Sequence, residues 1–256
     1  MKFGKKPYVP DERTVQFGRF MDPSFHAPTQ WDFDKGRAPF PIQDWGTRRY
    51  KTDVIAAQAN QLLRMGRIDQ RRTIPLESQD VIRRYKHVTG VKKMGDEHDD
   101  GVEMIEAFRA WKRGWQIRGR KYTISLYGEI EPLERDLLRT LIYVFRGVHF
   151  GFQLPEAVRS KPFEWHWDGE NGESWKPGSL GGTAAYCKAY TQSGYEVIVD
   201  GNLVKVSNEF VERFCDECWV AAEMLDYWAL QTLDMHRLSV LHPSLAYELG
   251  TKGGTA

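Results

Sequence analysis

The stretch Trp45-Gly46-Thr47-Arg48-Arg49-Tyr50-Lys51-Thr52-Asp53 leads directly into a segment with helical periodicity. One apolar stripe with this period, ended by Gly66, is formed by Val54, Ile55, Leu62, Leu63 and Met65. A second stretch, Gly181-Gly182-Thr183-Ala184-Ala185, opens a predicted strand over 183–190. The two stretches therefore predict the start of a helix at Thr52 or Asp53 and the start of a strand at Thr183.

The rest of the chain predicts helices in its first half and antiparallel strands in its second. Helices are expected over 77–89, 100–112 and 132–144, with strands over 122–127 and 148–154. Further strands are expected over 196–200 and 203–206, separated by hairpin signals, and then a long helix from Asn208 to about Leu233, capped by Ser207 or Asn208. This order is typical of an α+β fold and not of a repeated βαβ unit.

Residues 1–43 differ from the rest because prolines and isolated aromatics occur there without helical or strand period. We expect an extended N-terminal arm that wraps over a surface, either the chain's own or a partner's. The candidate interface residues of this arm are Phe17, Phe20, Phe25, Trp31 and Phe33. A single domain is expected over 44–235, followed by a tail over 236–256.

Composition argues against several classes of function. With 36 basic and 35 acidic residues among 256, the chain has no overall charge that would attract nucleic acid or an anionic membrane. Its three cysteines, Cys187, Cys215 and Cys218, form no disulfide framework, which favours a reduced, intracellular site of synthesis. The N-terminus does not read as a signal peptide, and no apolar run is long enough to span a bilayer, so a soluble protein is expected.

The two quoted stretches resemble the active-site segments of papain-like cysteine peptidases, and the chain resembles a group of papain-like proteins common in tailed phages and some bacteria. That group runs from a proline-rich start, through a Tyr-Gly-Asp-Cys helix opening, to a Gly-Gly-His strand. Matching pieces cover most of the chain: residues 4–13, 49–53, 85–90, 100–114, 147–155, 177–185 and 210–219. The resemblance implies a papain-like fold, in which a helix N-terminus activates a cysteine and a histidine on a facing strand exchanges its proton.

This sequence departs from the family at the positions that carry the chemistry. Asp53, or Thr52 one residue earlier, stands where the resemblance implies the cysteine, and Thr183 stands where it implies the histidine. A third residue, which would orient the histidine, is expected near Asp200 or Asn202. A carboxylate is a poor nucleophile toward peptides and threonine is no base near neutral pH, so the expectation is a protein that is not an enzyme.

Other clusters offer competing sites, each with a blander structural interpretation. Cys187 could be a displaced nucleophile, but a buried side chain is favoured. Cys215 and Cys218 have the spacing of a metal or redox site, yet they lie in a predicted helix without a second ligand pair. His166 with Asp168 could form a histidine-carboxylate pair, although an aromatic loop anchored in a core is favoured.

Two charged segments complete the candidates. Asp96-Glu97-His98-Asp99-Asp100 could bind Ca²⁺, but its spacing favours a solvated loop that supplies acidic residues to the next helix. A basic segment could meet phosphates, but a solvated helix face is favoured; it contains Arg64, Arg67, Arg71, Arg72, Arg83 and Arg84. No metal, cofactor or nucleic-acid ligand is therefore predicted.

The resemblance implies a structural role: an inactive minor capsid, decoration or connector protein of a phage virion. Such a protein would be made in the host cytoplasm and would bind other virion proteins in a symmetric assembly. Two alternatives stay open, a soluble module that binds peptides in the cleft, and a hydrolase that uses Asp53 with His166.

Overall fold

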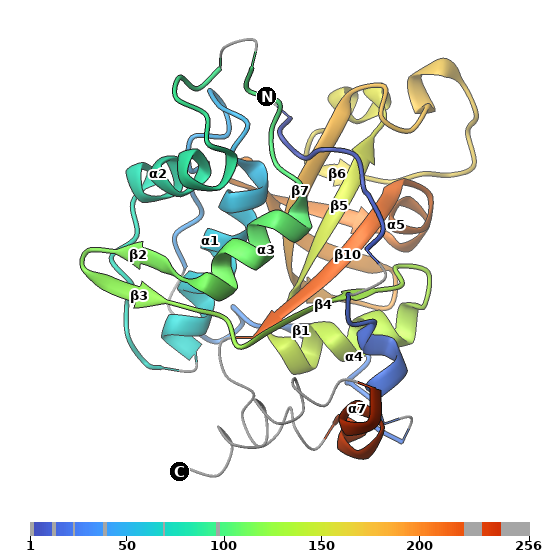
Figure 1. The fold of residues 1–256 in the computed structure, drawn as a ribbon. Coiled ribbons are helices and arrows are strands. Elements are labelled where there is room, and N and C mark those ends of the chain that lie inside the picture. The colour runs from blue at the N-terminus through green and yellow to red at the C-terminus, as the bar shows by residue number, and fades with distance from the viewer. Residues whose placement is uncertain are drawn as a thin grey trace.

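A helical half and a β half pack side by side, and the chain passes from one to the other and back (Figure 1). The computed structural model describes residues 3–11, 14–22, 24–37, 40–68, 70–95, 98–222 and 232–241. The helical half contains α1 (Asp53–Ile68), α2 (Ser78–Thr89), α3 (Met104–Arg113) and a hairpin of β2 (Trp115–Ile117) and β3 (Arg120–Tyr122). The α+β class that the sequence predicts is confirmed.

The β half is built on one sheet with the strand order β4-β10-β5-β7-β8-β9-β6. These strands are β4 (Leu126–Ile130), β5 (Val148–Leu154), β6 (Glu164–Trp165), β7 (Gly181–Tyr190), β8 (Gly194–Val199), β9 (Asn202–Ser207) and β10 (Cys215–Ala222). Neighbours are antiparallel except β6 and β9, and β1 (Trp31–Asp32) pairs with the end of β7. The helices α4 (Arg135–Phe145), α5 (Asn208–Phe214) and α7 (Met235–Leu241) complete this half, with the 3-10 turns Phe17–Phe20, Glu156–Ser160 and Glu173–Trp175.

Local capping explains several of the helix ends. Glu77 and Asp80 form a reciprocal capping box at the start of α2, and Gly90 ends that helix in the left-handed region at φ 72°. The Ser207 hydroxyl accepts a hydrogen bond from the Phe210 N–H at the start of α5. The predicted cap at Ser207 and the predicted end at Gly90 are therefore confirmed.

The long helix predicted from Asn208 to about Leu233 is wrong. The helix α5 ends at Phe214, and Cys215–Ala222 instead forms β10 between β4 and β5. Residues Glu217–Ala222 are all buried in this interior strand. The sequence therefore lacks the alternation of polar and apolar residues by which a strand is distinguished from a helix. Residues 223–231, the rest of that prediction, lie outside the described residues.

Smaller corrections concern the middle of the chain and its ends. The predicted strand over 122–127 is the end of β3 and the start of β4, and α3 begins at Met104 rather than at 100. The start of the predicted tail forms α7, in which Leu238 is buried against the core, while 242–256 lie outside the described residues.

The N-terminal arm wraps over the chain itself. Phe17, Phe20 and Phe33 are only 0%, 1% and 2% exposed within the core of the β half. Phe25 and Trp31 are partly buried against the same core. Of the two predicted modes, self-wrapping is the one that the structure has, because folding removes these aromatic side chains from water. The side chains of Phe17, Phe20 and Phe33 are therefore not accessible to a partner protein, whereas those of Phe25 and Trp31 are partly exposed.

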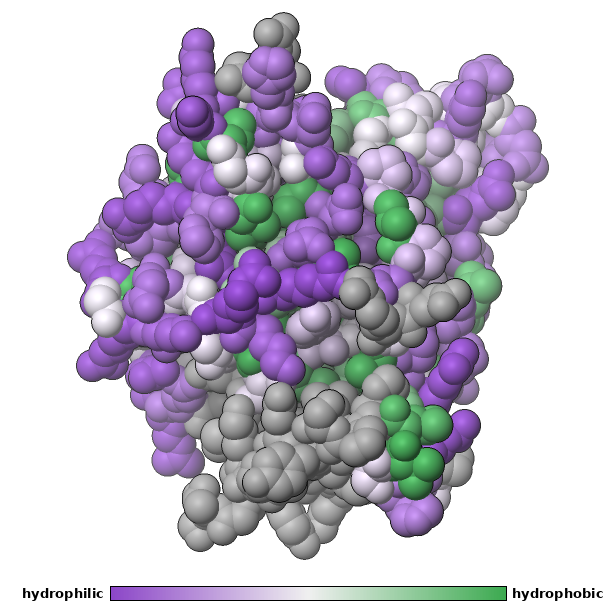
Figure 2. Space-filling model, in the orientation of Figure 1, coloured by the Kyte–Doolittle hydropathy of each residue, from purple (hydrophilic) through white to green (hydrophobic). Residues whose placement is uncertain are grey.

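The face of the molecule in Figure 2 is mostly hydrophilic, with apolar residues scattered over it, some of them at α7. In that helix Val240 and Leu241 are 64% and 56% exposed. None of the helices in the described part of the chain is long and apolar enough to cross a membrane.

Candidate functional site

Asp53 is the first residue of α1 and joins the helical half to the β half. Its side chain is almost fully buried, and its Oδ2 accepts a hydrogen bond from the Ala184 N–H of β7 at 3.0 Å. Burial raises the pKa of Asp53 to about 7; the Ala184 N–H opposes this rise, the nearby Asp200 carboxylate adds to it, and the Thr183 hydroxyl again opposes it. The helix start and the strand start that the sequence singles out therefore face one another.

Thr52 takes no part in this contact. It is buried, and its hydroxyl donates to the Trp45 carbonyl oxygen at 3.3 Å, within the loop that precedes α1. Of the two residues that the sequence left open, Asp53 and not Thr52 is therefore the one whose side chain reaches β7.

Of the two candidates for the third position, Asp200 is the one that acts on Asp53. Asp200 occupies the turn between β8 and β9 in the left-handed region at φ 49°, and its side chain is buried. Burial raises the pKa of Asp200, and the nearby Thr47 hydroxyl partly offsets this rise. The Asn202 amide only donates to the Asp200 carbonyl oxygen at 3.1 Å, which stabilises the turn. The site thus combines two buried carboxyl groups, those of Asp53 and Asp200, with two buried hydroxyls, those of Thr183 and Thr47.

The start of the N-terminal arm covers Asp53. The Lys5 N–H donates to the Gly182 carbonyl at 3.3 Å, the Val102 N–H donates to the Gly4 carbonyl at 2.8 Å, and the Lys6 N–H donates to the Val102 carbonyl at 3.2 Å. Residues 4–6 therefore form backbone hydrogen bonds with β7 on one side and with the segment before α3 on the other. A Cβ atom on Gly4 would lie 2.5 Å from Asp53 Oδ1 and 2.2 Å from the Lys51 carbonyl oxygen, so only glycine fits there.

Lys5 anchors this segment in a buried pocket of opposite charge. Its side chain is 0% exposed, and its Nζ lies 2.9 Å from both Asp216 Oδ2 and Glu217 Oε1. Burial opposes the charge of Lys5, but the attraction of Glu217 and Asp216 outweighs it and raises the pKa of the ammonium group. Gly151 leaves space for the lysine stem, since a Cβ there would lie 2.3 Å from Lys5 Cε. The sequence pattern gave no sign of this pocket, because its residues are separated by about half or more of the chain.

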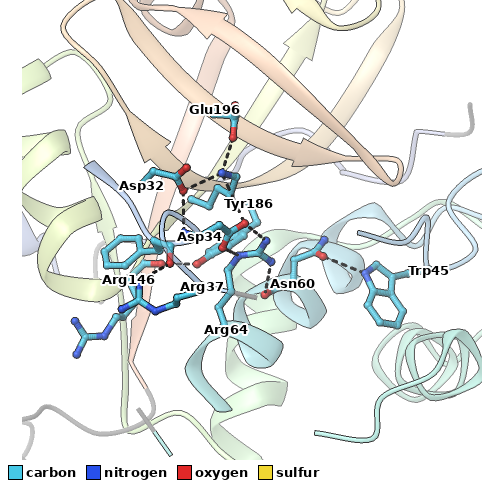
Figure 3. A network of polar contacts seen from close by, with 11 residues as sticks. Asp32, Asp34, Arg37, Trp45, Asn60, Arg64, Arg146, Tyr186 and Glu196 are labelled. Carbon is cyan, nitrogen blue, oxygen red and sulfur yellow. Dashed lines mark hydrogen bonds and ion pairs between the residues drawn. The ribbon is translucent and has the colours of Figure 1, made fainter. Parts of the chain in front are cut away.

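A second ionic cluster holds a later part of the arm (Figure 3). The Arg64 guanidinium of α1 donates two hydrogen bonds to the Asp34 carboxylate, at 3.0 and 2.7 Å. Lys188 of β7 lies 2.9 Å from Asp32 and 2.5 Å from Glu196. Arg64 was expected on a solvated helix face, and this expectation is wrong: its side chain is fully buried against the arm, where Phe40 and Tyr186 lie beside its guanidinium.

Arg64→Lys should lower the free energy of unfolding by about 2 kcal/mol, because an ammonium group cannot reproduce two parallel hydrogen bonds to a buried carboxylate. Urea denaturation at pH 7 measures this change. Arg67→Lys is the matched control on the same helix, since Arg67 is only partly buried and stacks on Phe40. An equal, small effect of both substitutions would contradict the role of the Arg64 and Asp34 pair.

The remaining candidate residues do not join the site. Burial raises the pKa of Cys187, Cys215 and Cys218, which makes each a poor nucleophile; Cys215 and Cys218 lie on β10 and not on a helix. His166 is exposed beside β6, three strands from β7 and so about 14 Å away across the sheet, while Asp53 is buried at β7. The structure therefore does not support a hydrolytic pair of Asp53 with His166.

The acidic loop has a structural role where it is described. Asp99 is buried and accepts hydrogen bonds from the Tyr85 hydroxyl and from the Gly95 N–H, whereas Asp96 and Glu97 lie outside the described residues. The described residues contain no group of three or more histidine, cysteine or acidic side chains placed to hold a metal ion. In the basic segment, Arg84 is also buried, and its guanidinium donates to the Gly114 carbonyl at 2.7 Å.

Comparison of the sequence with protein-family models and with curated proteins finds no match. Solved structures are similar in fold. Xylellain, a cysteine protease from Xylella fastidiosa, matches with a TM-score of 0.65 and 14% identity over 87% of this chain and 96% of that chain. Digestive procathepsin L 3 of Tenebrio molitor larval midgut matches with a TM-score of 0.55 and 10% identity over 82% of this chain and 73% of that chain. The cysteine protease CMS1MS2 of Carica candamarcensis matches with a TM-score of 0.51 and 12% identity over 77% and 99% of the two chains. Taken with the facing starts of α1 and β7, these similarities show that the chain has the papain-like fold.

Proposed function

We propose that this protein is a catalytically inactive member of the papain-like fold that acts through protein contacts, as a structural component of a phage virion. The observation that carries the inactive part is the buried carboxyl of Asp53 at the start of α1, with Thr183 beside it and Gly4 against it. A carboxyl with a pKa of about 7 in a closed site does not attack a peptide bond as a thiolate does, and the Thr183 hydroxyl beside it cannot accept a proton as a histidine base would.

The virion role rests on the resemblance to papain-like proteins of tailed phages, and it is an argument by analogy. A virion component of this kind would bind its neighbours through an arm, and this chain has an extended arm, whose ends are held on the chain itself by two ionic clusters. The proposal places the protein in the virion, after synthesis in the host cytoplasm, with other capsid or head-tail proteins as its partners.

A peptide-binding module is the second candidate, and a specific observation favours it. The cleft already holds a peptide segment, residues 4–6, through backbone hydrogen bonds on both sides and a buried lysine. In this version the cleft binds a peptide without cleaving it.

The activity test uses the unaltered protein and its Asp53→Ala variant with a mixture of unstructured peptides, followed by mass spectrometry. We expect no cleavage by either protein. Cleavage by the unaltered protein that disappears in the folded Asp53→Ala variant would contradict the proposal. For the structural role, we expect an antibody against the protein to label assembled phage particles, and a monomer without affinity for capsid or tail proteins would count against it.

A restored thiol tests whether Asp53 and Thr183 occupy the former catalytic positions. We expect Asp53→Cys with Thr183→His and Gly4→Val to react with iodoacetamide at pH 6 at least about tenfold faster than Asp53→Cys with Gly4→Val alone, because an unperturbed thiol is almost fully protonated there. The same pair without Gly4→Val should be protected, because Gly4 covers residue 53. Equal rates in all variants would show that these two positions do not cooperate.

A further inference from the structure

The pocket that holds Lys5 requires a cation. Glu217 is 3% exposed, and its described partners are Lys5 and the Trp219 indole N–H; the partners of Asp216 are Lys5 and the Gln153 amide. Burial raises the pKa of Glu217, and the charge of Lys5 opposes that rise. Without a lysine in the pocket, the buried Glu217 and the partly buried Asp216, which is 23% exposed, would have only neutral donors beside them.

Residues 3–6 lie in a groove between β7 and the segment before α3, and this groove also selects the residue before the lysine. Position 4 is limited to glycine by the Lys51 carbonyl and the Asp53 carboxylate, and Phe3 packs on Gly181, where a Cβ would lie 2.8 Å from its ring. The backbone of residues 4–6 is held on both sides by hydrogen bonds that do not depend on side chains. The groove thus recognises an extended Phe-Gly-Lys segment by an aromatic contact, a steric limit and a charge.

Nothing in these contacts requires that the segment belong to the same chain. Residues 7–10 begin and end with proline, and Val9 between them is 60% exposed, so the segment after Lys6 is extended and only partly packed. The next ionic anchor along the chain is Asp11, which pairs with Arg109. Exchange of an identical segment between two copies conserves every contact, so its net cost is small and local concentration decides which state prevails.

We propose that the groove binds the Phe3-Gly4-Lys5 segment of a second copy of this chain, so that copies held close together link by exchanging their first residues. The inference deepens the proposed function and rests on it, since a groove that cleaved peptides would destroy such a link. The occupant is a second copy because this segment satisfies all three requirements, and its lysine complements the charge of Asp216 and Glu217.

Two full-length variants separate the groove from the segment. Gly4→Val is the receiver, because its own segment no longer fits over Asp53 while its groove is intact. Gly182→Val is the donor, because a Cβ at residue 182 would lie 2.7 Å from the Lys5 carbonyl oxygen, whereas the nearest atom outside the arm is Gln153 Nε2 at 3.8 Å. Both substitutions therefore expel the segment while the surrounding strand keeps its space.

Sedimentation velocity at micromolar concentrations provides the first measurement. Each variant alone should sediment as a monomer, and the mixture should form a one-to-one dimer. The matched control adds Lys5→Met to the donor, which should weaken the dimer by about 30-fold or more because the buried Glu217 and the adjacent Asp216 then lack their cation. A mixture of folded variants that stays monomeric would overturn the proposal.

A labelled peptide of residues 1–8 provides a second measurement that does not depend on the donor variant, with Gly4→Val as the receiver because its groove is intact. Binding that is lost when Lys5 of the peptide is replaced by methionine supports recognition in trans. Absence of binding overturns it, and so does binding of both peptides with equal strength. Mass spectrometry of the bound peptide reports separately on the proposed function, because a cleaved peptide contradicts inactivity without bearing on recognition.

Discussion

Lys5→Met is expected to lower the free energy of unfolding by about 4 kcal/mol, the largest loss that we predict for a single side chain. The substitution conserves the length of the stem but removes the charge that lies 2.9 Å from Asp216 and from Glu217. The buried Glu217 then lacks a cation, and the partly exposed Asp216 lies beside it. Urea denaturation at pH 7, followed by tryptophan fluorescence, measures the loss.

The neighbouring lysine supplies the matched control for this prediction. Lys6 is half-buried, and Lys6→Met should change stability by at most about 0.5 kcal/mol, as surface substitutions do. Adding Glu217→Gln to Lys5→Met should restore part of the lost stability, because one uncompensated charge disappears. If Lys5→Met and Lys6→Met gave the same midpoint, the buried pocket would have no energetic role.

Asp53→Asn is expected to stabilise the protein at neutral pH and to leave it unchanged near pH 4. The pKa of the buried Asp53 is about 7, above its ordinary value of 3.8, so the folded state holds a proton that the unfolded state has released between these values. The stability that this proton provides is present at low pH and is lost as pH rises toward 7, by about 1.4 kcal/mol per pH unit. The amide resembles the protonated carboxyl, so the advantage of the variant should reach about 4 kcal/mol at pH 7 and then level off.

His149 provides a second group with the opposite sign. Burial lowers its pKa to about 3, and its Nε2 lies 2.6 Å from Gln61 Oε1. The stability that comes from keeping this imidazole neutral is present above its ordinary pKa of 6.5 and is lost as pH falls below that value. Between about pH 4 and 6.5 the two slopes therefore cancel in the unaltered protein.

Single variants should uncover the two slopes. Relative to the parent, the stability of Asp53→Asn should rise with pH over this range, whereas that of His149→Gln, which conserves a hydrogen bond to Gln61, should fall with pH. Urea denaturation at half-unit steps of pH gives the free energy of unfolding of both variants and of the parent. Subtracting the parent's value at each pH removes the contributions of the other titratable groups. A constant difference between Asp53→Asn and the parent from pH 4 to 8 would contradict the raised pKa.

The predictions for Lys5 and Asp53 share a structural cause, which is the closure of the cleft by the chain's own first residues. Gly4 lies against Asp53, and Lys5 fills the acidic pocket one residue later. The groove and the segment that fills it lie within one chain. Altering residues 4–6 should therefore change three properties together: the release of the arm, the pH dependence of the stability, and the linking of copies.

Local sequence patterns predicted several elements correctly. The start of α1, predicted at Thr52 or Asp53, the strand β5 over Val148–Leu154 and the hairpin strands β8 and β9 follow from helical stripes, alternation and turn residues, all of which act over a few neighbours. The facing of Asp53 and Thr183 was implied by the resemblance and not by spacing. The strand β10 was missed because an apolar run buried on both faces has no distinctive period.

The sequence by itself determined the α+β class, the polar residues at the starts of α1 and β7, and a proline-rich arm with aromatic side chains, since each depends on local propensity and pattern. Only the tertiary structure decided that Asp200 acts on Asp53, that Arg64 is buried against Asp34, and that Lys5 meets Asp216 and Glu217. The last two partnerships join residues 30 and 211 or more positions apart. A charged group that is removed from water needs an opposite charge beside it. Which groups are buried depends on the whole fold and is not visible in a short stretch of sequence.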